Sequence, residues 1–318
     1  MPEVSFIVAA FNVAPYVAAA IGSALQQTDT EVEVIVVDDA SSDGTADIVS
    51  ELAKRDARVT LVRRAKTGGP SVARNTAMEM ARGSWLAILD GDDLIAPERT
   101  RRLLDLATAT AADMVADNFR RFSEESSLSS TMIAEAAEPY AFYVDVASFI
   151  RGNVMFDRGA RLGYVKPMFR TAFIREHGIR HRESVFVGED YHLCLSGLLA
   201  KARFVVTSKS YYQYRVRAGS LSWRLKRSDI DELLRAHEAS LREEAYPDNP
   251  DVADAARTYA RALERAHALA VAIENAKAGR WPNVLASALR RPAMVPLLAR
   301  FGGEAVGKRL KLFASPSG

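Results

Sequence analysis

Three carboxylates, Asp90, Asp92 and Asp93, fall within four residues directly after a short apolar run, Trp85–Leu89. The run is typical of a strand buried in a parallel sheet. Carboxylates this close to one another repel unless a cation neutralises them. A hard divalent ion such as Mg²⁺ prefers oxygen ligands, and it commonly binds together with the diphosphate of a substrate. Gly91 lets the backbone approach such a ligand. The alternative is a solvated turn, because Asp and Gly are common turn residues.

The segments that would position these carboxylates alternate between strand and helix. Apolar runs predict strands over residues 4–10, 32–37, 59–62 and 85–89. Helical periodicity predicts one helix beginning near Pro15, a second after the turn 41–44, and a third that follows the loop 68–70 and is capped by Ser71. This alternation predicts an α/β fold with a doubly wound sheet.

Ligands of doubly wound sheets bind outside the carboxyl ends of the strands. Phe11 and Asn12 follow the first predicted strand, and Asp38 and Asp39 follow the second. Arg74, on the helix behind the glycine loop, could face the same crevice. The sequence contains neither G-x-G-x-x-G nor G-x-x-x-x-G-K-[ST], so we expect neither a dinucleotide dehydrogenase nor a P-loop NTPase. Turn formation is the alternative role for the two aspartates.

Composition sets broad limits on the class of protein. The chain has 318 residues, of which 48% are hydrophobic and 26% charged, which suits a globular protein of one large domain or two. A net charge of +2 gives no bias toward nucleic acid. The single cysteine, Cys194, excludes an internal disulfide and fits a cytoplasmic protein. We expect no signal peptide, and no run approaches the ~18 apolar residues of a membrane span.

Four short motifs together carry a resemblance to a known family. They are VAAFN (8–12), VIVVDDASSDGT (34–45), GGPSVARN (68–75) and LDGDD (89–93). In this order and at these spacings they resemble the family-2 glycosyltransferases of the GT-A fold, over residues 3–222. Within the family the chain looks most like bacterial enzymes of exopolysaccharide assembly, such as the glucosyltransferases of succinoglycan synthesis.

The resemblance implies a division of the chain into three parts. Residues 1–110 would form the nucleotide-sugar-binding half of one GT-A domain, which is a Rossmann-like, doubly wound mixed sheet. Residues 111–222 would form its acceptor-binding and catalytic half. Residues 223–318 lie beyond the resemblance, and their own pattern predicts a C-terminal helical region that could associate with a membrane.

The resemblance also assigns four residues to the nucleoside of a UDP-sugar donor. Phe11 takes the place of the family's usual tyrosine, whose ring lies against the uracil, and stacking survives the loss of the hydroxyl. Asn12 belongs to the same donor site. Asp39 would accept a hydrogen bond from the uracil imide N–H, and Arg74 would help to hold the nucleotide.

Around the diphosphate, the resemblance implies that Asp90 faces the ribose and that Asp92 binds Mg²⁺ or Mn²⁺, while Asp93 supports the loop. Residues 212–222 are similar to the family's Tyr-x-Tyr-Arg-x-His-x-x-Ser segment, but Arg217 occupies the histidine position. If that histidine ligates the metal, this chain lacks the ligand. Arg217 could instead neutralise the departing diphosphate directly.

Gly188–Asp190 matches the family's Glu-Asp motif at the start of a predicted helix, and by resemblance Asp190 is the general base. The alternative is an acidic pair that only stabilises the positive end of the helix dipole. His192 is expected to be structural. His177 and His181 are four residues apart, but nothing completes a zinc site, so we interpret both as surface or packing residues.

The last part of the chain is helical and then basic. Residues 228–278 are rich in alanine, and residues 280–311 contain many Arg and Lys residues against a single acid, Glu304, with apolar residues between them. Such a basic amphipathic tail could lie on an anionic membrane surface. The alternative is a helix packed on the catalytic domain with a solvated basic face.

By this resemblance the chain looks like an inverting glycosyltransferase that moves a hexose from a UDP-sugar to a saccharide acceptor carried on a lipid, at the inner face of the bacterial membrane. A non-catalytic component that binds sugar nucleotides or glycans is one alternative, and the intact Asp92 and Asp190 argue against it. A sugar nucleotidyltransferase is another. It should carry a loop rich in glycine and basic residues after the first strand, and residues 9–14 contain neither.

Overall fold

The computed structural model describes residues 1–124, 128–134, 136–155, 157, 161–217, 227–243 and 249–290. Its strands are β1 (Val4–Ala10), β2 (Val32–Asp38), β3 (Val59–Arg63), β4 (Trp85–Asp90), β5 (Leu94–Ile95), β6 (Met114–Phe122), β7 (Ser129–Thr131), β8 (Ala141–Val144), β9 (Met168–Arg170) and β10 (Phe204–Arg215). Its helices are α1 (Val17–Leu25), α2 (Thr45–Arg55), α3 (Pro70–Met80), α4 (Arg99–Thr110), α5 (Val146–Gly152), η1 (Leu162–Tyr164), α6 (Thr171–Glu176), α7 (Glu189–Leu199), α8 (Arg227–Glu243), α9 (Pro250–Lys277) and α10 (Trp281–Arg290).

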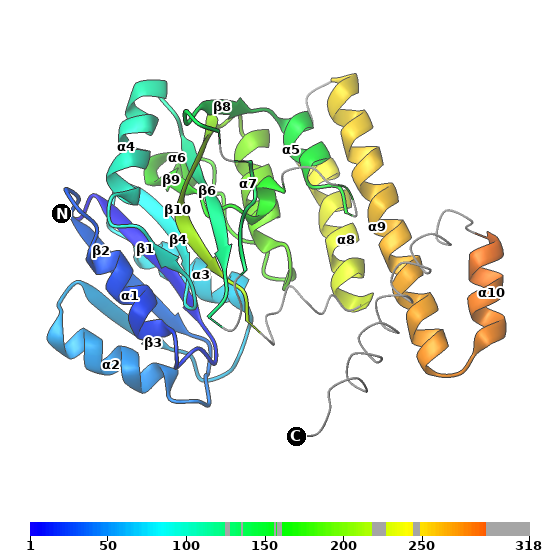
Figure 1. The fold of residues 1–318 in the computed structure, drawn as a ribbon, viewed down its shortest axis with the longest axis horizontal. Coiled ribbons are helices and arrows are strands. Elements are labelled where there is room, and N and C mark those ends of the chain that lie inside the picture. Colours follow the sequence, from blue (N-terminus) through cyan, green and yellow to red (C-terminus); the bar gives the residue numbers. More distant parts are fainter. Residues whose placement is uncertain are drawn as a thin grey trace.

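The first four strands form the parallel part of the sheet in the order β3-β2-β1-β4. Their apolar side chains fill the core, and β2 is buried along its whole length. Helices α1 and α2 contact each other on one face of the sheet, and α3 lies on the opposite face (Figure 1). The chain moves in one direction along the sheet from β1 to β3 and returns past β1 to β4, so right-handed crossovers place α3 on the other side. The predicted alternation of strand and helix is confirmed. Ser71 is not the helix cap: α3 begins with Pro70 after Gly69, and the Ser71 hydroxyl donates to the Val185 carbonyl.

The second half of the chain continues the same sheet instead of forming another domain. β9 pairs antiparallel with both β4 and β6, β10 pairs parallel with β6, and β5 pairs antiparallel with β10. The described residues thus form one mixed sheet of 10 strands, as expected from the resemblance. Strand β10 is long and reaches Arg215, because Tyr212 and its neighbours also pair with β6.

Helices α8, α9 and α10 form a flank beside the sheet, with α9 in contact with α5, α8 and α10 (Figure 1). Three aromatic rings fix this flank to helices α5 and α7. Tyr191 of α7 stacks on Phe149 of α5 and on Tyr259 of α9, with ring centroids 5.2 and 4.8 Å apart. Arg151 of α5 adds an ion pair to Asp251 of α9.

No helix among the described residues is long and apolar enough to cross a membrane. Residues 218–222 of the Tyr-x-Tyr-Arg segment and residues 291–311 of the basic tail lie outside the described ranges.

Candidate active site

A cleft of about 710 Å³ opens at the carboxyl ends of β1, β2 and β4. The strand register brings these ends together, because Ala9 lies opposite Asp90 on β4 and Ala10 lies opposite Asp38 on β2. Motifs that are far apart in the sequence therefore meet there. The cleft is lined by residues of all four motifs, by the start of α7, by the end of β10, and by Leu233 and Tyr259 of the helical flank.

Phe11 and Asn12 form one end of the cleft. The Phe11 side chain is 49% exposed, so its ring is free to take a stacking partner. Asn12 has a left-handed backbone with φ of 52°. Its side-chain oxygen accepts from the backbone N–H of Ser42 at 2.9 Å, and its own N–H donates to the Ser41 hydroxyl. Asn12 thus ties the loop after β1 to the loop after β2.

Asp39 lines the cleft, but its carboxylate is engaged with the loop that precedes α3. It accepts from Arg64 at 2.5 Å, from the Thr67 hydroxyl at 2.7 Å, and from the backbone N–H groups of Gly68 and Gly69. The side chain is only 4% exposed, so its hydrogen bonds mainly hold this glycine loop in place. Asp38 turns away and accepts from the backbone N–H of Ser41.

The carboxylates of Asp92 and Asp93, in the acidic loop after β4, point in different directions. Asp92 faces the cleft and forms an ion pair with Arg217, whose Nε lies 2.6 Å from Oδ2 of Asp92. Asp93 turns inward and accepts from the Tyr212 hydroxyl at 2.8 Å and from the backbone N–H of Arg215 at 2.7 Å. Burial, together with the charges of Asp90 and Asp92, raises the pKa of the Asp93 carboxyl well above its usual range. Asp93 therefore fastens the loop to β10.

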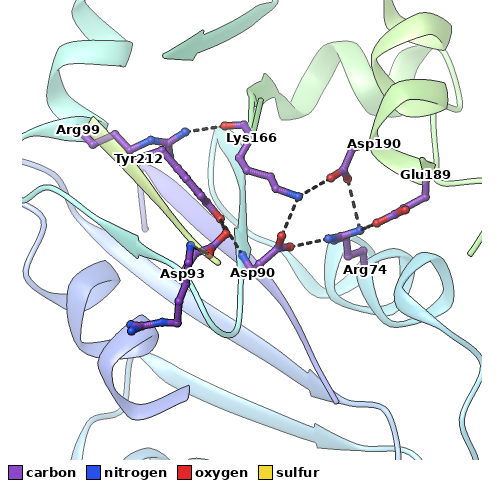
Figure 2. A network of polar contacts seen from close by, with 9 residues as sticks. Arg74, Asp90, Asp93, Arg99, Lys166, Glu189, Asp190 and Tyr212 are labelled. Carbon is purple, nitrogen blue, oxygen red and sulfur yellow. Dashed lines mark hydrogen bonds and ion pairs between the residues drawn. The ribbon is translucent and has the colours of Figure 1, made fainter. Parts of the chain in front are cut away.

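Asp90 and Asp190 belong to one cluster of charged side chains, hereafter the charged cluster, which also contains Arg74, Lys166 and Glu189 (Figure 2). Arg74 contacts Asp90 at 2.6 Å, Glu189 at 2.5 Å and Asp190 at 3.3 Å. Lys166 contacts Asp90 at 2.8 Å and Asp190 at 2.6 Å. The cluster joins α3, the end of β4, the segment before β9, and α7.

Burial and charge act differently on the two acids of α7. Burial opposes ionisation of the Asp190 carboxyl, but the charges of Arg74 and Lys166 outweigh it and hold the pKa of Asp190 below its ordinary value. For Glu189, burial and the charge of Asp190 dominate, so its pKa is raised. The pKa of Lys166 is raised despite its burial, because Asp190 and Asp90 favour the ammonium. The charged cluster therefore contains an ionised Asp190 beside a less acidic Glu189.

Among the described residues of the cleft, Asp92 is a carboxylate that a divalent ion could use as a ligand. No group of three or more His, Cys, Asp or Glu residues that could hold a metal occurs in the part of the chain that the structure describes. Asp90 already neutralises Arg74 and Lys166, whereas Asp92 faces the cleft with one cationic partner. Mg²⁺ tolerates such a sparse protein site when substrate phosphates and water complete its shell.

The histidines are not part of this chemistry. His181 and His192 are each 1% exposed, and burial lowers the pKa of both to about 3. His177 is exposed and packs on the Phe173 ring at 4.3 Å. His181 and His192 are thus buried in the core, and His177 lies at the surface.

The sequence reasoning missed Lys166. A single lysine between a valine and a proline carries no motif, and its partners lie 24 and 76 residues away. Only the sheet topology could have indicated its role. Strand β9 pairs antiparallel with β4, and Met168 lies opposite Ala87. That pairing brings the residue two places before Met168 close to the end of β4, where Asp90 lies.

Comparison with known proteins identifies the family of this chain. The model of glycosyl transferase family 2 matches residues 5–173, and the chain belongs to that family. Succinoglycan biosynthesis protein ExoO of Rhizobium meliloti is 35% identical over 315 residues, which cover 99% of this chain and 88% of ExoO.

Solved structures show the same fold at lower identity. S. aureus TarS in complex with UDP-GlcNAc is 22% identical with a TM-score of 0.64, over 82% of this chain and 71% of that one. The mannosyltransferase PcManGT from Pyrobaculum calidifontis, in complex with GDP-Man and Mn²⁺, is 19% identical with a TM-score of 0.60, over 98% of this chain and 83% of that one.

Proposed function

We propose that this chain is an inverting glycosyltransferase that moves a hexose from a UDP-sugar to a saccharide acceptor in the synthesis of a bacterial exopolysaccharide or other surface glycan. The observation that supports this most is the pair Asp90 and Asp190. One ends the strand beside the proposed nucleotide site, the other begins α7, and both meet at Lys166 in the wall of the cleft. A base and a donor site this close allow direct displacement at one carbon.

The reaction needs one base. Asp190 accepts the proton of an acceptor hydroxyl, the oxygen attacks the anomeric carbon, and the bond from that carbon to the diphosphate breaks on the opposite face. The new bond therefore has inverted configuration, and UDP leaves. Asp190 is ionised because Lys166 and Arg74 lower its pKa, which also makes it a weak base. It therefore accepts the proton only as the new bond forms and the acceptor hydroxyl becomes more acidic.

The donor occupies the end of the cleft near Phe11 in this proposal. The half-exposed ring stacks on the base, and Asp90 faces the ribose. Because the Asp39 oxygens already accept several hydrogen bonds from the glycine loop, uracil would share them with that loop. The UDP-GlcNAc complex of TarS supports a uridine donor, whereas the GDP-Man complex of PcManGT shows that the fold also takes guanosine.

A divalent metal, Mg²⁺ or Mn²⁺, belongs to the proposed donor site through Asp92. The Mn²⁺ in the PcManGT complex supports this assignment. When bound, such an ion neutralises the departing diphosphate. Arg217, already on Asp92, contributes a second positive charge at the same point.

The acceptor occupies the other end of the cleft, where the lining is aromatic and apolar. Tyr164 is 40% exposed there, and Leu233 and Tyr259 of the helical flank complete the wall. Aromatic rings suit the C–H faces of sugar rings as well as apolar groups. We assign this end to a saccharide, carried on a lipid, whose hydroxyl reaches Asp190.

Helix α10 is the proposed contact with an anionic membrane surface at the cytoplasmic face. Trp281, Leu285 and Leu289 are 61%, 64% and 84% exposed, and their spacing of four places them on one helix face. Arg280 precedes them. An exposed apolar stripe beside basic residues is typical of a helix that lies in a membrane interface.

A donor panel tests the proposed function. UDP-glucose, UDP-galactose, UDP-GlcNAc and GDP-mannose are each incubated with the protein, with and without Mg²⁺ or Mn²⁺, and release of the nucleoside diphosphate is measured. We expect slow hydrolysis of one UDP-sugar. Binding of a UDP-sugar without any turnover, with or without saccharide acceptors, would favour the non-catalytic alternative. Formation of a sugar nucleotide from a sugar 1-phosphate and UTP would favour a nucleotidyltransferase.

A further inference from the structure

We propose that Lys166 is a positioning residue of this reaction, which holds the base Asp190 in register with the donor-site carboxylate Asp90. The inference rests on the proposed function and extends it to a residue outside the recognised motifs. Lys166 Nζ lies 2.6 Å from Oδ2 of Asp190 and 2.8 Å from Oδ2 of Asp90 (Figure 2). One ammonium thus fixes the separation between the donor and acceptor sides of the cleft.

The backbone of Lys166 is anchored from inside the protein. Its carbonyl oxygen accepts from Arg99, whose guanidinium is fully buried, at 2.5 Å. Arg99 in turn forms an ion pair with the buried Asp117 at 2.9 Å. The next residue, Pro167, accepts a hydrogen bond from Ile88 of β4. A side chain held at its base in this way can place its charged end within narrow limits.

The same buried residues also fix the backbone of Asp90, the other partner of Lys166. The Tyr212 hydroxyl donates to Asp93 and accepts from the backbone N–H of Asp90 at 3.2 Å, and the backbone N–H of Tyr212 donates to Asp117. Asp117 therefore contacts both Arg99, which holds Lys166, and Tyr212, which holds Asp90. The distance from Lys166 to Asp90 is set by this buried network as well as by their own attraction.

The charge balance of the cluster shows what Lys166 contributes. Three carboxylates, Asp90, Asp190 and Glu189, face two cations, Arg74 and Lys166. Arg74 touches all three acids, but only Lys166 contacts Oδ2 of Asp190. Without Lys166, the Asp190 side chain would lose its closest contact and would be repelled by Asp90, so it would leave the position that a near-attack geometry requires.

The proposal is tested by donor turnover, which needs no acceptor besides water. Hydrolysis of the UDP-sugar selected by the donor panel is measured for wild type, Lys166→Met and Lys166→Arg, with UDP affinity by calorimetry. We expect Lys166→Met to lower kcat by ~10²-fold, the usual cost of a misplacement of about 1 Å. KM and UDP affinity should stay within a few-fold. Lys166→Arg should restore part of kcat, because it keeps the charge at a changed distance.

Arg170→Met is the matched control. Arg170 lies on the adjoining strand β9 and forms an ion pair with Asp113 at 2.5 Å, outside the cleft. This variant measures the effect on turnover of losing a similar ion pair that has no catalytic role, and we expect wild-type kcat. If Lys166→Met does not fold, Lys166→Arg decides: a kcat reduced by ~10-fold or more with unchanged UDP affinity supports the proposal, and an unchanged kcat overturns it.

The proposed function and the positioning role of Lys166 are contradicted by different results. If wild type turns over the donor and Lys166→Met does so equally well, Lys166 has no positioning role while the proposed function stands. A Lys166→Met variant that loses UDP affinity and kcat in parallel also overturns the proposal, because it shows a donor-binding role. If wild type turns over no donor in the panel, with or without saccharide acceptors, the proposed function itself is wrong, and the positioning role falls with it.

Discussion

Arg217 and Asp92 form an ion pair in which Nε of the arginine lies 2.6 Å from Oδ2 of the aspartate. A fixed cation is therefore already present beside the carboxylate assigned to the metal. The Arg217 guanidinium also lies over the Tyr16 ring, 5.4 Å from its centroid, which restrains its position. Both Arg217 and the metal can neutralise the diphosphate, so we expect donor binding to depend only partly on metal.

This expectation is tested by titrating UDP by calorimetry into wild type, Asp92→Ala and Arg217→Gln, with Mg²⁺ and with chelator. A charge-assisted contact contributes about 1.5–3 kcal/mol, or roughly 10- to 100-fold in affinity. Chelation should weaken UDP binding to wild type, and the loss should be larger in Arg217→Gln. Arg63→Gln, which removes an exposed ion pair with Asp47, is the control. Equal affinity in every condition would exclude a role for metal at Asp92.

Local patterns in the sequence predicted the parallel half of the fold. The strands at 4–10, 32–37, 59–62 and 85–89 are apolar runs closed by polar residues, so composition alone marks them. Their order in the sheet, β3-β2-β1-β4, is one that short right-handed crossovers allow, although the sequence did not predict it. Ser71 was assigned wrongly as a cap because its hydroxyl has a better partner, the carbonyl of Val185, which is 114 residues away.

The charged cluster could be predicted only in part. Asp90, Arg74 and Asp190 lie in motifs, but nothing in the sequence shows that Arg74 contacts both aspartates. Lys166 enters through the antiparallel pairing of β9 with β4, a contact between distant segments that periodicity does not reveal. The pairing of Arg217 with Asp92 depends likewise on where β10 ends. Which residues pair in this buried cluster therefore depends on how the strands pair in the sheet.

Helix α10 should bind anionic membranes. The stripe of Trp281, Leu285 and Leu289 is exposed, and each basic residue near an anionic surface adds about 1 kcal/mol at low salt. In flotation with vesicles of phosphatidylglycerol and phosphatidylcholine, we expect wild type to float at low salt and less at high salt. Leu285→Asp and a chain ending at Lys277 should float less than wild type.

Met80→Asp is the control for this measurement, because Met80 is 43% exposed at the end of α3 and away from the helical flank. It should float like wild type. If the chain ending at Lys277 floats as well as the full chain, the segment from α10 onward does not carry membrane binding, and its basic residues form a solvated face.

The buried histidines should make the protein sensitive to acid. His181 and His192 have a pKa of about 3 in the folded state, against about 6.5 in unfolded chains. Between these values the unfolded state binds more protons, so the free energy of unfolding is highest above pH ~6.5 and falls as the pH decreases toward 3, by up to ~1.4 kcal/mol per pH unit for each histidine.

Urea unfolding at pH 7.5 and 5.0 measures this loss. The difference between the two pH values should be smaller in His192→Leu than in wild type, because leucine does not titrate. His177→Leu, which changes an exposed histidine, should keep the wild-type difference. A His192→Leu variant that loses as much stability as wild type would show that His192 does not contribute to the acid sensitivity.

The most direct test of the account compares the two acids at the start of α7. Asp190→Asn keeps the shape of the side chain but removes its basicity, and loss of a general base lowers the rate by ~10²–10⁴-fold. We expect this variant to fold and to bind UDP, with some loss of stability because Lys166 and Arg74 lose a buried anionic partner, while sugar transfer falls by that order. Glu189→Gln, the neighbouring residue whose carboxylate contacts Arg74, should keep most of the transfer rate. Near wild-type transfer by Asp190→Asn, or loss of transfer in Glu189→Gln alone, would contradict the assignment of Asp190 as the base.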